Sequence, residues 1–199
     1  NTTGSENTAL GTDALKANTT AANNVAVGYY SAQANTTGTA NVSLGAYSFY
    51  TNTTGGSNTA LGYGTLAANT TAANNTAVGK DALLRNTTGA SNTAIGTQAL
   101  QLNTTGTTNV AVGMNTLKDN TTGGYNTALG EGSLLANTTA SNNTAVGQTS
   151  MRFNTTGANN TALGRNSLYR NTTGPSNTAV GTNALQANTT ATANAALGY

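Results

Sequence analysis

The tripeptide Asn-Thr-Thr recurs every 17 residues along the whole 199-residue chain. No insertion or deletion interrupts the spacing, and the last of the twelve copies is cut short at Tyr199. A fixed period in this range is typical of solenoids and other arrays, in which each repeat is one structural unit stacked on the next. We therefore interpret residues 1–199 as a single array, with repeats starting at residues 1, 18, 35, 52, 69, 86, 103, 120, 137, 154, 171 and 188.

Several positions of the repeat, numbered from its Asn-Thr-Thr, never vary. Positions 1, 2, 3, 7 and 11 are Asn, Thr, Thr, Asn and Gly in every copy. Position 10 is always Leu, Val or Ile, and position 15 is large and apolar in every copy that contains it, apart from Ala32. High polarity with little charge is also found in disordered chains. Two aliphatic positions held in strict register indicate a folded rung instead, because a slip of one residue turns every side chain to the other face.

The repeat length restricts the secondary structure of each rung. Seventeen residues are too few for a helical hairpin, which needs more than about 30, and Gly and Asn recur too often for helix interiors. Two short strands joined by two turns do fit. Positions 7–10 are predicted to form one strand and positions 14–17 a second, with Asn-Thr-Thr-Gly as the return turn. The pattern predicts an all-β fold: a parallel β-solenoid (β-roll or β-helix) of twelve rungs.

Charge separates the inside of a rung from its outside. All twelve charged residues fall at positions 6, 12, 13, 16 or 17, which are therefore predicted to face water. The core is predicted to consist of positions 10 and 15, helped by Thr or Val at position 8. The predicted core residues at position 10 are Leu10, Val27, Leu44, Leu61, Val78, Ile95, Val112, Leu129, Val146, Leu163, Val180 and Leu197.

The two turns of the rung differ in their need for glycine. Position 4 is Gly in eight copies and Ala in four, so that turn is not expected to require a positive φ. Position 11 tolerates only Gly, which predicts a positive φ or a very close backbone approach. These obligatory turn residues are Gly11, Gly28, Gly45, Gly62, Gly79, Gly96, Gly113, Gly130, Gly147, Gly164, Gly181 and Gly198.

Position 9 is Ala in eleven copies and Ser43 in the other. A position facing solvent would vary and would carry some charge, so a constantly small residue suggests that another backbone packs against it. Two large aliphatic side chains per rung also make a thin core, which predicts a marginally stable lone chain. We therefore expect the chain to associate with copies of itself.

The segment Asn92-Thr93-Ala94-Ile95-Gly96, followed by Ala99, resembles the head repeats of YadA-like trimeric autotransporter adhesins. With the Asn-Thr-Thr-Gly extension it is similar to arrays in bacterial and phage tail-fibre proteins. The resemblance extends over all twelve repeats. It implies a left-handed parallel β-roll, three chains around a common axis (a homotrimer) and a role in surface attachment. Adhesin head repeats are usually shorter than 17 residues, so the extra Asn-Thr-Thr is expected to enlarge a turn, and nothing here matches a neck, stalk, membrane anchor or chaperone domain.

Asn-Thr-Thr is also an acceptor sequence for N-glycosylation, and further acceptor sequences begin at Asn41, Asn74, Asn142 and Asn159. The alternative is an asparagine ladder, in which side-chain amides bond from rung to rung. Rungs about 4.7–4.9 Å apart leave little room for a glycan on each one, which favours the ladder. The residues concerned are Asn1, Asn18, Asn35, Asn52, Asn69, Asn86, Asn103, Asn120, Asn137, Asn154, Asn171 and Asn188.

Five tyrosines crowd repeats two to four at positions expected to be exposed: Tyr29, Tyr30, Tyr47, Tyr50 and Tyr63. Such a patch suits stacking on a sugar or docking of a protein receptor, and the alternative is a simple aromatic ladder along the rungs. Rows of Thr also suggest ice binding. However, adjacent threonines point to opposite sides of a strand, and the repeat has no Thr-x-Thr pair.

Composition argues against several classes of function. Without His or Cys, and with its five acidic residues scattered over different rungs, the chain offers no catalytic group, so we expect no enzyme activity and no cofactor. Calcium-binding repeats need Asp in each turn, so we expect no metal. A net charge of +2 is too small for nucleic-acid binding. No apolar run approaches the roughly 20 residues of a membrane span.

These observations predict a structural segment of an extracellular or virion fibre, providing a rigid rod and surface attachment. The expected location is extracellular, at a cell surface or on a virion appendage. Neither end shows a capping repeat, so we expect a piece of a longer chain, or a subunit that continues end to end in a filament. The alternatives are an adhesin head that binds a host glycan or protein, a heavily glycosylated extracellular filament, and an ice-binding solenoid.

Overall fold

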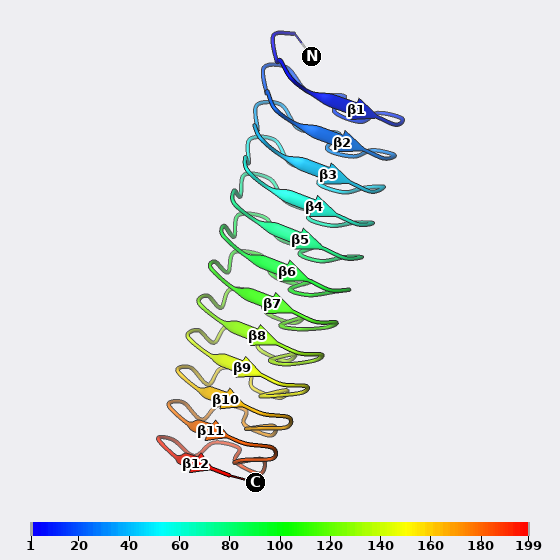
Figure 1. Cartoon of the computed structure of the whole chain (residues 1–199). Helices are drawn as coiled ribbons and strands as arrows, with labels where there is room; N and C mark the ends of the chain where they lie inside the picture. Colours follow the sequence, from blue (N-terminus) through cyan, green and yellow to red (C-terminus); the bar gives the residue numbers. More distant parts are fainter. Residues whose placement is uncertain (1, 199) are drawn as a thin grey trace.

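Every repeat contributes one three-residue strand, formed by its positions 8–10. The computed structural model describes residues 2–198. In Figure 1 the strands lie on the near side of the coil and the chain returns on the far side as it descends, which gives a left-handed solenoid with its ends at opposite ends of a rod. The strands are β1 (Thr8–Leu10), β2 (Val25–Val27), β3 (Val42–Leu44), β4 (Thr59–Leu61), β5 (Thr76–Val78), β6 (Thr93–Ile95), β7 (Val110–Val112), β8 (Thr127–Leu129), β9 (Thr144–Val146), β10 (Thr161–Leu163), β11 (Thr178–Val180) and β12 (Ala195–Leu197).

The twelve strands form one parallel sheet in sequence order, and each pairs with the strand of the next repeat. In the pairing of β6 with β7, for example, Ala94 lies opposite Ala111 and Ile95 opposite Val112. The register is therefore 17 residues at every step, so each position of the repeat forms a straight row along the rod. The predicted parallel β-solenoid is confirmed.

The core differs from the predicted one at one of its two principal positions. Position 15 is interior as predicted: Leu100 is fully buried. Its partner is position 9 rather than position 10, since Ala94 is fully buried whereas Ile95 is 40% exposed. Side chains alternate along a strand, so with position 9 pointing inward, positions 8 and 10 point outward. The core assignment was wrong for Leu10, Val27, Leu44, Leu61, Val78, Ile95, Val112, Leu129, Val146, Leu163, Val180 and Leu197, all of which are half-buried or exposed.

The narrow interior of the rung explains why position 9, rather than position 10, is buried. The leucine at position 15 nearly fills the space behind the sheet, which leaves room for a methyl group at position 9 but not for a second large side chain. The small residue at position 9 thus packs inside its own chain. The inference that a partner backbone covers it was wrong, and position 9 is no evidence for oligomerisation.

The second predicted strand, at positions 14–17, is replaced by a tight turn over positions 11–17. Within it, φ is +59° at Gln98 and +51° at Leu100, and the same two positions are left-handed in the other rungs. A left-handed residue does not continue a strand. The chain must reverse direction within these seven residues while keeping Leu100 inside, which an extended segment cannot do. The backbone still bonds from rung to rung, with Leu100 N donating to Thr116 O at 3.0 Å.

The glycine at position 11 is required for both of the predicted reasons. The φ of Gly96 is +132°, and a Cβ there would lie 2.6 Å from the carbonyl oxygen of Gly113 on the next rung. Gly89, at position 4, has no such φ. A Cβ on Gly89 would nevertheless press against the carbonyl oxygen of Gly106, so that turn is tighter than the sequence suggested. Ala72 occupies the same position in the preceding rung, which shows that the fold makes the necessary adjustment.

The charged residues all lie at exposed or half-buried positions, as predicted. Over residues 2–198, no helix is long and apolar enough to cross a membrane.

We predict that Gly96→Ala lowers the free energy of unfolding by about 2 kcal/mol or more, because it combines backbone strain with a backbone clash. Gly89→Ala is expected to cost clearly less, because its φ suits alanine. Chemical denaturation of the two variants measures the difference. Equal unfolding midpoints would contradict the distinction between the two turns.

Candidate functional site

The asparagines at position 1 form a ladder along the rod. The side-chain amide of Asn103 donates to Oδ1 of Asn86 at 2.8 Å, and Asn120 donates in the same way to Asn103 at 2.8 Å. The series is continuous from Asn18 to Asn188. Asn1, the first predicted member, lies outside the described residues. The interpretation of Asn-Thr-Thr as a ladder is supported directly by these hydrogen bonds.

The asparagines at position 7 form a second ladder, which the sequence analysis did not identify. Oδ1 of Asn92 accepts from the backbone N–H of Asn109 at 2.9 Å, and Oδ1 of Asn75 accepts likewise from Asn92. This contact joins every pair of successive rungs. The invariance of this Asn among the twelve repeats was the available signal.

The two ladders meet at the carbonyl oxygen of position 4. Gly106 O accepts from the amide of Asn103 in its own rung at 3.0 Å, and from Asn92 of the preceding rung at 2.9 Å. A Cβ on Gly106 would press against Oδ1 of Asn103 and the carbonyl oxygen of Gly123, and would lie 3.0 Å from the amide nitrogen of Asn120. Position 4 is therefore restricted to Gly and Ala by the ladder side chains and the backbone of the next rung rather than by its own backbone angles.

Burial of the ladders decides which acceptor sequences are open to a glycan in the folded chain. Asn103 is fully buried, and its amide donates two hydrogen bonds, as do those of the other inner position-1 asparagines. Asn41, at position 7, is buried as well. The asparagines of the remaining three acceptor sequences, Asn74, Asn142 and Asn159, occupy position 6 and are exposed. A folded rod has no space for a glycan on the ladder.

The two threonines after the ladder asparagine have different environments. Thr104, at position 2, is half-buried, and its hydroxyl donates to Thr121 O on the next rung at 3.0 Å. Thr105, at position 3, is exposed, as is every position-3 threonine that the structure describes. The side chains at positions 2 and 3 point in different directions, as predicted. The position-3 threonines form the row that is exposed in every described rung.

The five tyrosines of the predicted patch come together on one side of the rod. Tyr47 is the centre: its ring centroid lies 5.4–5.9 Å from those of Tyr29, Tyr30, Tyr50 and Tyr63. Tyr29 and Tyr63 are 43% and 54% exposed, whereas the other three are half-buried. We call these five residues the tyrosine cluster. It spans three rungs and presents aromatic faces and hydroxyl groups to solvent together.

The tyrosine cluster alters the acidity of one of its members. Hydrogen bonding to the side chain of Tyr30, together with desolvation and the proximity of Tyr47, raises the pKa of Tyr29 to about 12. Tyr29 therefore remains a neutral phenol throughout the physiological pH range.

The outer face of the sheet carries a row of Thr or Val at position 8, ending in Ala195, and a row of Leu, Val or Ile at position 10. The large apolar residues are openly exposed in the inner rungs: Leu44 is 38% exposed, Ile95 40% and Leu163 37%. No repeat has a charged residue at positions 8–10. We call this surface the sheet face. It is long, straight, uncharged and apolar in one of its two rows.

Acidic groups do not gather anywhere among residues 2–198 in a way that would hold a metal ion. The one ion pair found over this range joins Lys16 to Asp13 at 3.1 Å on the surface. No protein-family model, curated protein or solved structure matches the chain.

We predict that Asn103→Ala lowers the free energy of unfolding by about 3 kcal/mol, because it leaves Asn86 Oδ1 without its donor and removes an acceptor from Asn120 in a buried site. Thr105→Ala, two residues away and exposed, is the matched control and is expected to change it by less than about 0.5 kcal/mol. Denaturant unfolding measures both. Similar losses in the two variants would contradict a structural ladder.

We predict that Tyr30→Phe lowers the pKa of Tyr29 from about 12 towards the ordinary value near 10, because the hydrogen-bonding partner is lost. In the parent chain, stability is expected to fall between these two pH values, since the unfolded state releases the Tyr29 proton before the folded state does. Absorbance of ionised phenols in an alkaline titration measures the shift. Tyr125→Phe, at an exposed tyrosine in a distant rung, is the control, and persistence of the step near pH 12 in Tyr30→Phe would contradict the assignment.

Proposed function

We propose that this chain is a rigid rod segment of an extracellular or virion fibre, without catalytic activity, that associates laterally with two further copies of itself. The observation that carries the proposal is the sheet face. It runs uninterrupted along twelve rungs, a length of roughly 55 Å at the usual strand spacing. Contiguous apolar surface of this extent is uncommon on monomeric proteins and marks interaction sites.

Rigidity is supported by the number of independent bonds at each step of the coil. Between the inner rungs, backbone pairing in the sheet, the two asparagine ladders and the position-2 threonine hydroxyls all cross the same gap. Bending the rod would stretch the hydrogen bonds on the outer side of the bend, and several bonds would have to lengthen at once. Such a segment suits the role of a rigid spacer in a fibre better than that of a flexible linker.

A lateral contact between copies is favoured because the sheet face is free of charge and carries an exposed apolar row. Residues such as Ile95 would become buried against their counterparts in neighbouring copies, while the charged positions 12, 13, 16 and 17 lie on the turn after the sheet and can remain in water. The number three comes from the sequence resemblance to trimeric adhesin heads. Placement at a cell surface or on a virion is part of this proposal.

Native mass spectrometry and sedimentation equilibrium test the association. The expected particle contains three chains of 19.7 kDa. Replacing two outward residues by lysine, in the double variant Ile95→Lys and Val112→Lys, is expected to give a folded monomer, because the charges would be buried at the contact. The interior is untouched by these changes.

The matched control places the lysines two residues later in the same rungs, at position 12, in the double variant Thr97→Lys and Met114→Lys. This position lies on the turn that follows the strand. Lys80 and Arg165 occupy this repeat position naturally. The control is expected to remain trimeric. A parent chain that is monomeric at all concentrations, or a control that dissociates as readily as the sheet-face variant, would overturn the proposed association.

A second candidate, an adhesin head that binds a host glycan or protein, is favoured by the tyrosine cluster. Clustered, partly exposed tyrosines supply rigid apolar area with hydroxyl groups at its edge, a combination that is frequent in binding surfaces. This candidate is compatible with the rod, since the cluster lies on the turns after the sheet rather than on the sheet face. The filament glycosylated at Asn-Thr-Thr is disfavoured by the buried ladder.

A further inference from the structure

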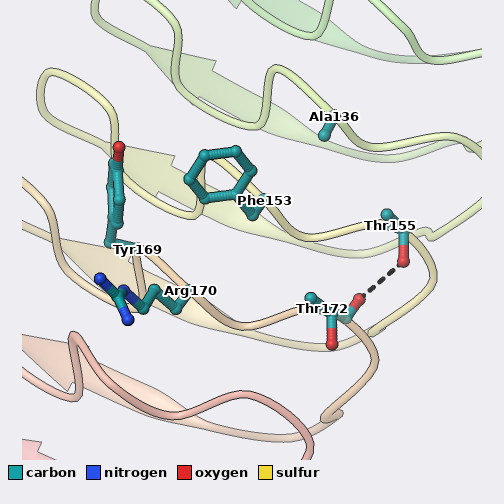
Figure 2. A pocket seen from close by; sticks show the side chains of 6 residues that line it. All are labelled: Ala136, Phe153, Thr155, Tyr169, Arg170 and Thr172. Carbon is teal, nitrogen blue, oxygen red and sulfur yellow. Dashed lines mark hydrogen bonds between the residues drawn. The ribbon is translucent and has the colours of Figure 1, made fainter.

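A hollow of about 650 Å³ opens on the side of the rod towards its C-terminal end. It lies where positions 16 and 17 of one rung lead into the Asn-Thr-Thr turn of the next (Figure 2). Its origin is a difference between neighbouring rungs: position 17 is small in Ala136 and bulky in Phe153 and Arg170. The residues that line it are Ala136, Phe153, Thr155, Tyr169, Arg170 and Thr172.

Two aromatic rings form one wall of this hollow. The centroids of Phe153 and Tyr169 are 5.1 Å apart and the rings are nearly perpendicular, at 84°. Phe153 is 43% exposed although it packs against Tyr169. An edge-to-face pair leaves a ring face open, and an open aromatic face packs well against the C–H groups of a flat, partly apolar ring.

Two guanidinium groups flank the aromatic wall. Figure 2 shows Arg170 extending beneath Tyr169 at the edge of the hollow. The guanidinium carbon of Arg152 lies 6.0 Å from the centroid of Phe153, and its Nη1 rests above Gly132, where a Cβ would come within 2.9 Å of it. Within residues 2–198, neither arginine takes part in an ion pair. From residue 120 onwards the chain has three arginines and one acidic residue, Glu131.

The floor of the hollow can accept hydrogen bonds but has few donors to spare. The hydroxyl of Thr155 already donates to Thr172 O at 3.0 Å, and that of Thr172 donates to Thr189 O at 3.1 Å. Their oxygen atoms remain able to accept from a ligand. A molecule rich in hydroxyl groups meets this requirement.

We propose that this hollow binds an anionic saccharide whose negative charge is a carboxylate, such as a uronic acid oligomer. The pyranose ring packs on Phe153 and Tyr169, its carboxylate pairs with Arg170, and its hydroxyl groups donate to the threonine oxygens. Arginine matches carboxylates in a two-pronged geometry that a neutral sugar cannot use. The volume lies within the range of small-molecule sites, and the lining residues come from four successive rungs. The site does not depend on the rod being trimeric.

Isothermal titration calorimetry at low salt with the hexamer of galacturonic acid tests the site. Binding is expected for the parent chain, and Phe153→Ala and Arg170→Gln are each expected to weaken it about tenfold or more, the equivalent of 1.4 kcal/mol. Both side chains lie outside the core, so circular dichroism is expected to show the same fold. Maltohexaose, which is uncharged, is expected to bind far more weakly.

Matched controls come from the repeat itself. Arg85 and Leu102 occupy position 17, the position of Arg170 and Phe153, in rungs without an aromatic pair. Arg85→Gln and Leu102→Ala are expected to leave the affinity unchanged. The proposal is overturned by absence of binding to the parent chain, by equal affinity for maltohexaose, or by equal losses in the Arg85 and Arg170 variants.

Discussion

One hydrogen-bond arrangement determines most of what this chain can be: two asparagine amides converging on the carbonyl oxygen of position 4. Gly106 O receives Asn103 from its own rung and Asn92 from the rung before, so each rung is tied both within itself and to its neighbour. Buried amides are costly unless satisfied, and here nearly every one is satisfied by its own rung together with a neighbouring rung. The structure therefore depends on repetition, because a single rung would leave these groups unpaired.

This dependence explains why a chain with so few large apolar residues holds a definite fold. Each rung encloses little more than one leucine and two small residues, such as Leu100, Ala94 and Ala99. Polar ladders and backbone pairing supply the order that a larger core supplies in a globular domain. Because the interior is specified by asparagine, glycine and alanine, the outer positions are free to vary, and the tyrosine cluster and the arginine-flanked hollow occupy such positions on rungs that are otherwise alike.

Sequence alone predicted the solenoid, its period, the glycine turn and the inner row at position 15, since each follows from invariance at a 17-residue spacing. The prediction failed where the sequence pattern allowed either face of the strand to point inward. An aliphatic residue at position 10 and an alanine at position 9 are both compatible with an interior, and only the dimensions of the rung decide between Ile95 and Ala94. The tyrosine cluster was visible as a local excess of one residue type. The hollow was not, because it depends on the contrast between Ala136 and Phe153 in adjacent rungs.

Hydrogen exchange of asparagine side-chain amides, measured by NMR, tests the central claim most directly. The protons of Asn103 and Asn120 lie inside the ladder, whereas Asn74 and Asn142, in the same chain, are exposed at position 6. Exchange of the ladder amides is predicted to be far slower, approaching the rate of global unfolding, while the exposed amides exchange freely. Equal exchange rates for the two groups would contradict a solenoid held together by buried asparagines.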